Sequence, residues 1–139
     1  LNDDEHRQLW DELVEFPAAG QAPLVIQATM VPSGTTSFIL AARQLDPACS
    51  IQAHAGSGIV TVRFSEFPSQ GLSRVLVGTL QPGAASAHGN VVILSNPSGN
   101  EMTARSSWGS VRSPLSLLSR IKNNFDPGNL LNPGRFVYP

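Results

Sequence analysis

Two alternating segments joined by a glycine-rich turn restrict most strongly the folds open to this chain. Residues 49–55 alternate apolar and polar side chains, and residues 59–64 read Ile-Val-Thr-Val-Arg-Phe. The second segment is rich in the β-branched residues that favour strands. Gly56-Ser57-Gly58, which lies between the two segments, is typical of a tight turn. The pattern predicts an antiparallel hairpin.

The length of the turn decides which side chains share a face of this hairpin, because a shift of one residue reverses every side chain. A three-residue loop would pair His54 with Val60. A loop with an even number of residues would place polar side chains from both strands on one face: Gln52, His54, Thr61 and Arg63. We expect the even loop, because it gives one polar and one apolar face.

Strand and helix patterns flank the hairpin in a regular order. Residues 24–31 have the alternation of a strand, and the apolar stripe that follows predicts a helix ending at Asp46-Pro47. After the hairpin, a helix is expected to about Leu80, then a short turn over 84–87 and a strand over 90–95 covered on both faces. Residues 96–112 look like a loop. The order βαββαβ predicts an α+β fold with a ferredoxin-like antiparallel sheet and helices packed on one face.

Extra helices are expected at both ends of the chain. Residues 3–16 are amphipathic and begin with a capping box, Asn2 followed by Glu5. A last helix should begin at Ser113-Pro114 and stop at Asp126-Pro127-Gly128, with a core face formed by Leu117, Leu118, Ile121 and Phe125. Leu130 and Leu131 should then pin the chain to a core before a second turn at Pro133-Gly134.

The composition narrows the class of protein. The net charge of −1 argues against a nucleic-acid partner, which normally requires a basic face. The single cysteine, Cys49, excludes an internal disulfide and is expected to be a small core residue in a reducing compartment. Because the chain begins with Leu1, we expect a part of a longer polypeptide.

Four segments resemble, in the same order, the FAD-binding subunit of bacterial glycolate oxidase, a member of the vanillyl-alcohol oxidase type of FAD-linked oxidases. They read PLVIQATMVPSGTT, IQAHAGSGIVTVRF, AHGNVVILSNP followed by SSWG, and IKNNFDPGNLLNPGRFVY. Together they span about residues 22–139. The resemblance implies that residues 1–139 form a single C-terminal cap domain, which covers the flavin and shapes the substrate pocket.

In that family FAD is bound mainly by an N-terminal domain, which this chain lacks. Gly56-Ser57-Gly58 joins two strands and opens no helix, so it does not predict a phosphate cradle. The resemblance therefore implies an FAD-dependent 2-hydroxyacid oxidoreductase in which the isolated chain is inactive. It further implies an iron–sulfur partner subunit and a small hydroxyacid substrate. The expected location is the cytoplasm, where partner subunits could attach the enzyme to the membrane.

Two polar residues of the hairpin are candidates for catalysis. His54 matches the first histidine of an H-x-G-x-G-x-x-H pattern in related dehydrogenases, but Thr61 stands at the second, so no metal is expected. His54 could instead bind a hydroxyacid or remove its proton, or simply face the sheet. Arg63 could bind the substrate carboxylate through two hydrogen bonds from its guanidinium, or pair with Glu66 at the surface.

Three other residues are candidates for flavin contacts. Trp108 could stack on the flavin edge or plug the edge of the core. Asn132 and Arg135 flank the Asn-Pro-Gly turn, where the family chain returns toward the FAD domain, although a purely structural turn would look the same. The alternative function for the whole chain is a non-catalytic ferredoxin-like module that binds a protein or a small ligand.

Overall fold

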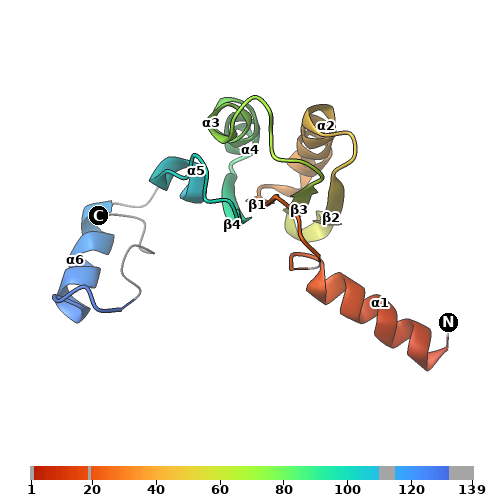
Figure 1. The fold of residues 1–139 in the computed structure, drawn as a ribbon, viewed down its shortest axis with the longest axis horizontal. Coiled ribbons are helices and arrows are strands. Elements are labelled where there is room, and N and C mark those ends of the chain that lie inside the picture. The colour runs from red at the N-terminus through yellow and green to blue at the C-terminus, as the bar shows by residue number, and fades with distance from the viewer. Residues whose placement is uncertain (1, 19, 110–114, 132–139) are drawn as a thin grey trace.

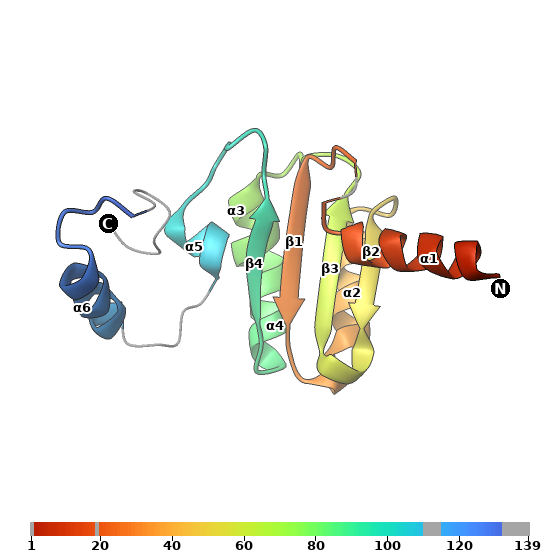
Figure 2. The same ribbon diagram turned by 90° about the horizontal axis from the view of Figure 1, so that it is seen from below.

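The computed structural model of the protein describes residues 2–18, 20–109 and 115–131. At its centre is a four-stranded antiparallel sheet in the order β2-β3-β1-β4 (Figure 1). The strands are β1 (Leu24–Thr29), β2 (Ser50–His54), β3 (Ile59–Phe64) and β4 (Asn90–Ser95). Helix α2 (Thr35–Leu45) and the helical segment from α3 (Leu72–Val75) to α4 (Gln81–Ser86) lie behind the sheet in Figure 2. The predicted α+β fold is confirmed.

The core lies between this sheet and these helices. Ile26 opposite Val62 and Leu24 opposite Phe64 put apolar side chains on one face of the two central strands. Phe38 from α2 and Leu76 from the second helical segment pack into the same buried cluster. Strand alternation and helix periodicity thus supply the two halves of one core.

The hairpin has the expected register. Gln52 lies opposite Thr61 and His54 opposite Ile59, so the residues between the paired positions, 55–58, form an even loop. The turn contains a short 3₁₀ helix, Ala55–Ser57, and ends at Gly58 with a positive φ of 68°. A side chain at Gly58 would collide with the carbonyl of Met30, so glycine is required there.

The second helical segment is longer than the sequence predicts. A π-helical turn, η3 (Leu76–Leu80), joins α3 to α4, so the backbone is helical from Leu72 to Ser86. Gly78 and Pro82 both weaken a regular α-helix, which is why the sequence predicts a helix only to about Leu80. Instead, the wide π turn holds Gly78, and Pro82 lies in the first turn of α4, where a missing N–H is tolerated.

The prediction that β4 is covered on both faces is wrong. Leu94 is 45% exposed, and the core helices lie on only one side of the sheet (Figure 2). A short apolar run does not itself show that both faces of a strand are covered, because periodicity is the only local signal of coverage and a run of six residues carries little of it.

A short helix, α5 (Ala104–Trp108), lies in the region expected to be a loop. It begins with a reciprocal cap: the Ser106 N–H donates to Thr103 Oγ1, and the Thr103 N–H donates to Ser106 Oγ. Serine replaces the usual Glu or Gln of a capping box, which explains why the pattern was missed.

The terminal helices form, but their apolar sides are not covered by the described chain. Helix α1 (Asp3–Glu15) has the expected Asn2–Glu5 capping box. Helix α6 (Leu115–Phe125) ends where predicted, although its expected start at Ser113-Pro114 lies outside the described residues. The core face predicted for α6 is wrong: Leu117, Ile121 and Phe125 are exposed. The apolar side of α1 is also exposed, at Leu9, Trp10, Leu13 and Val14.

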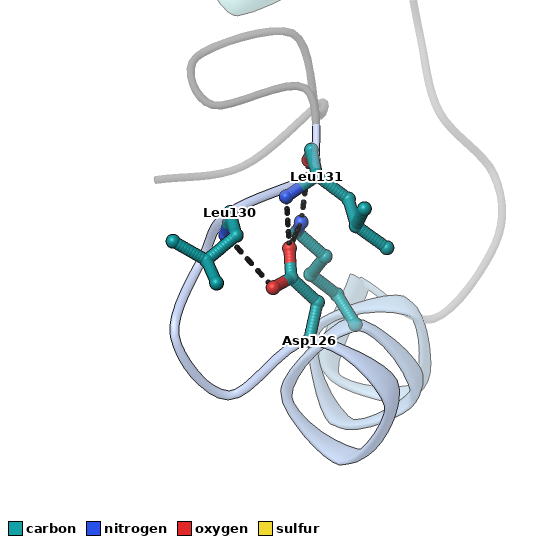
Figure 3. Close-up of polar contacts among 4 residues, drawn as sticks. Asp126, Leu130 and Leu131 are labelled. Atoms are coloured by element: carbon teal, nitrogen blue, oxygen red, sulfur yellow. Dashed lines mark hydrogen bonds and ion pairs between the residues drawn. The ribbon is translucent and has the colours of Figure 1, made fainter.

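Asp126 holds the chain that leaves α6 (Figure 3). Its carboxylate accepts hydrogen bonds from the backbone N–H groups of Leu130 (2.8 Å) and Leu131 (2.9 Å) and pairs with Lys122. The side chains of Leu130 and Leu131 are 81% and 65% exposed, so the prediction that they pin the chain to a core is wrong. The turn at Pro133-Gly134 lies outside the described residues.

Candidate functional site

The sheet presents a mainly polar face on the side opposite the core helices. We call it the polar sheet face; its polar members are Gln27, Thr29, Ser50, Gln52, His54, Thr61, Arg63 and Asn90. The sequence predicted that Gln52, His54, Thr61 and Arg63 share a face, and the strand register confirms it. No helix of the core layer covers this side (Figure 2).

A row of polar residues crosses the middle of the polar sheet face. Gln52 on β2 lies opposite Thr61 on β3, which in turn lies opposite Gln27 on β1. Thr61 is only 2% exposed, so its neighbours cover the centre of the face. Sequence reasoning named the apolar side of β1 and missed Gln27. The same alternation, counted from Val25, would have placed it here.

His54 ends β2 beside the turn and is exposed. Its position opposite Ile59 puts it at one corner of the polar sheet face. An exposed imidazole can donate or accept a hydrogen bond to a bound hydroxyl group.

Arg63 lies at the other end of β3 and is half-buried. Its guanidinium carbon lies 5.5 Å from the centre of the Phe16 ring, within the range of a cation–π contact. Its Nε is buried and has no hydrogen-bond partner among the described residues. Within the residues that the structure describes, no ion pair joins Arg63 to Glu66.

His54 and Arg63 share a face but do not lie together. Ile59, opposite His54, and Arg63 are separated by four positions along β3. At about 3.4 Å per residue this separation is about 14 Å along the strand. An α-hydroxy acid carries its hydroxyl and carboxylate on adjacent carbons, so the two residues do not form one compact pocket within this chain.

The end of α1 closes over part of the polar sheet face. Gln52 Nε2 donates a hydrogen bond to the backbone carbonyl of Leu13 (2.7 Å). This carbonyl belongs to the last turn of α1, where carbonyls lack partners within the helix. Together with the contact between Phe16 and Arg63, this bond places the start of the chain against β2 and β3.

The candidates for flavin contacts lie away from His54. The carbonyl of Trp108 accepts a hydrogen bond from Asn90 Nδ2 (2.7 Å), which places α5 beside β4. Trp108 is 41% exposed at this edge, whereas His54 is on the opposite edge strand, β2. Asn132 and Arg135 lie outside the described residues.

Other chemically active residues are separate from the polar sheet face. Cys49 is a core residue, as predicted, and burial raises the pKa of its thiol, with the nearby Asp46 carboxylate adding to the effect. A hollow of about 120 Å³ lies at the end of β3, lined in part by Asp46, Phe64 and Glu66. Across the described ranges no three His, Cys, Asp or Glu side chains are grouped to hold a metal ion.

No protein-family model, curated protein or solved structure matches the chain. No helix in the described parts of the chain is long and apolar enough to cross a membrane.

Proposed function

We propose that this chain is the substrate-binding cap domain of an FAD-dependent 2-hydroxyacid oxidase or dehydrogenase of the glycolate-oxidising type. The observation that carries the proposal is the polar sheet face, which brings His54, Gln52 and Thr61 to one side of a ferredoxin-like sheet. The ordered sequence motifs that resemble glycolate oxidase support it independently. An N-terminal FAD-binding domain would face this side, and an iron–sulfur subunit would take up the electrons.

The chain itself is not suited to hold the whole of FAD. Its glycine-rich turn forms a three-residue 3₁₀ helix between two strands and offers no long helix N-terminus for a diphosphate. FAD, when held by its own domain, supplies the acceptor for the substrate hydride. The cap contributes by binding the hydroxyacid, orienting it and excluding water.

Within the cap we assign the main role to His54. In this proposal its exposed imidazole accepts the proton of the substrate hydroxyl group, while the hydride leaves the carbon that bears this hydroxyl group. Arg63 lies about 14 Å from His54 along the strand and contacts Phe16, so the carboxylate contact predicted for it is not part of this proposal for a small hydroxyacid held at His54. Trp108, Asn132 and Arg135 remain proposed contacts to the flavin or its domain.

Flavin titration tests the proposal. The isolated chain should bind FAD weakly or not at all, whereas the polypeptide that joins it to the domain encoded upstream should bind FAD and be reduced by a 2-hydroxy acid. Absence of an FAD-binding domain both upstream of Leu1 and in any partner chain would overturn the proposal.

A second function is favoured by one observation. Both terminal helices expose apolar side chains, Phe125 being 79% exposed, as expected of a module that binds another protein. Failure of both the short and the long protein to bind flavin would support this non-catalytic module.

A further inference from the structure

Both terminal helices leave an apolar side without a partner. In α1 the side chains of Trp10 and Val14 are 67% and 66% exposed, and Leu9 and Leu13 lie beside them. In α6 the exposed side chains are those of Leu117, Ile121 and Phe125. Helices of 13 and 11 residues are marginally stable alone in water, so each gains stability from a surface that covers its apolar side.

The two helices have opposite charges. Helix α1 carries six carboxylates against one arginine, Arg7, for a net charge of −5 with histidine neutral. Helix α6 carries Arg120 and Lys122; Lys122 pairs with Asp126, the residue after the helix, so the net charge over residues 115–126 is +1 and Arg120 supplies it. The two helices therefore have apolar stripes of similar length and net charges of opposite sign, so they are complementary to each other.

The two helices of one copy lie at opposite ends of the molecule. Helix α1 extends beyond the β2 edge of the sheet and α6 lies beyond the β4 edge, in both views (Figures 1 and 2). The sheet separates them, so pairing between α1 and α6 in this arrangement requires a second copy.

We propose that two copies of this chain form a closed dimer in which α1 of each copy packs against α6 of the other. Two copies side by side in opposite directions bring each acidic helix to a basic helix, and the two contacts are equivalent by two-fold symmetry. The apolar sides supply the burial, while the opposite charges select α1–α6 pairing over α1–α1 or α6–α6 pairing. This inference does not rest on the proposed function.

A complementation experiment with residues 1–139 tests the pairing. One variant carries Leu9→Glu with Leu13→Glu in α1, and a second carries Leu117→Glu with Ile121→Glu in α6. The wild-type chain should have twice the 14.8 kDa mass of one copy by light scattering, and its dimer should weaken as salt is raised. Each variant alone should be a monomer.

An equimolar mixture of the two variants should again form a dimer, because one intact α1 then meets one intact α6. Control variants on the polar sides, Gln8→Ala and Asn123→Ala, should remain dimeric, and circular dichroism should show unchanged helix content. A monomeric wild type, an assembly that grows without limit, or a variant that dimerises alone would each overturn the proposal. So would a mixture that stays monomeric.

Discussion

The carboxylate of Asp46 accepts hydrogen bonds from both the backbone N–H of Ser65 (2.7 Å) and its hydroxyl group (2.8 and 2.9 Å). Asp46 follows the last residue of α2, and Ser65 follows the last residue of β3. A further bond from the Ala48 N–H fixes the turn into β2. Burial opposes ionisation, but the bonds from Ser65 and Ala48 leave the pKa of Asp46 below its ordinary value.

Replacing Asp46 should therefore destabilise the fold in a pH-dependent way. Asp46→Ala is expected to lower the free energy of unfolding at pH 7 by about 1–2 kcal/mol, because hydrogen bonds to a charged group are lost. A lowered folded-state pKa gives stability above the unfolded value of about 3.9, and this stability is lost as pH falls through the folded value. Urea unfolding from pH 7 to pH 3 measures the difference, which should shrink below pH 4. A constant difference would contradict the assignment, and exposed Glu66→Ala is the control.

Glu101 is expected to stabilise the start of α3. Its Oε2 accepts hydrogen bonds from the N–H of Leu72 (2.6 Å) and, more weakly, from that of Ser73 (3.4 Å). Glu101→Gln should lower the unfolding free energy by about 1 kcal/mol, the usual value of a helix N-cap. Gly71→Ala should cost more, because φ is 86° and the new Cβ would lie 3.0 Å from Glu101 Oε2. Guanidinium unfolding measures both changes; equal stability of all three proteins would exclude this role.

Gln52 is expected to hold α1 against the sheet. Gln52→Ala removes the hydrogen bond to the Leu13 carbonyl and should increase amide exchange in the last turn of α1 several-fold, at little global cost. Ser50→Ala, on the same face of the same strand, is the matched control. Hydrogen exchange with mass spectrometry measures amide exchange in α1 of both variants. If Gln52→Ala left exchange in α1 unchanged, the contact would have no role in holding the helix.

The hydrogen bonds and the ion pair of the Asp126 carboxylate should weaken at low pH. The hydrogen bond from Lys122 is the main cause that lowers the pKa of Asp126, and the Leu130 and Leu131 N–H groups add to it against a smaller effect of burial. The stabilisation from the ionised carboxylate is therefore fully present above the ordinary pKa of about 3.9. It is lost as the pH falls through the lowered pKa of the folded state. Amide exchange at Leu130 and Leu131 should rise in Asp126→Asn at pH 7. Protection that is independent of both pH and this substitution would contradict the arrangement.

The sequence was sufficient for the hairpin because its determinants are local. Alternation assigns Gln52 and Thr61 to one side of each strand, and the preference for one polar face selects the even loop that pairs them. The distance between His54 and Arg63 follows from the same register and could have been counted. The contact of Arg63 with Phe16 could not, because it depends on where α1 meets the sheet.

The remaining differences have physical causes that local patterns do not carry. An apolar stripe on α6 identifies a side that avoids water but not the surface that covers it, so Phe125 was wrongly assigned to a core. Gly78 and Pro82 weaken a regular α-helix, whereas packing of Leu76 and Leu80 in the core stabilises the π turn between α3 and α4. Tertiary packing decides both cases.

The rate of flavin reduction by glycolate, measured by stopped flow in the FAD-loaded polypeptide that contains this chain, tests the central claim most directly. His54→Gln should slow reduction on the order of 10²-fold, the usual contribution of a proton-transfer group, while FAD stays bound. His6→Gln, which alters an exposed histidine on α1, should leave the rate unchanged. An unaltered rate in His54→Gln would contradict the assignment of the polar sheet face as the substrate-binding side of a flavoenzyme cap.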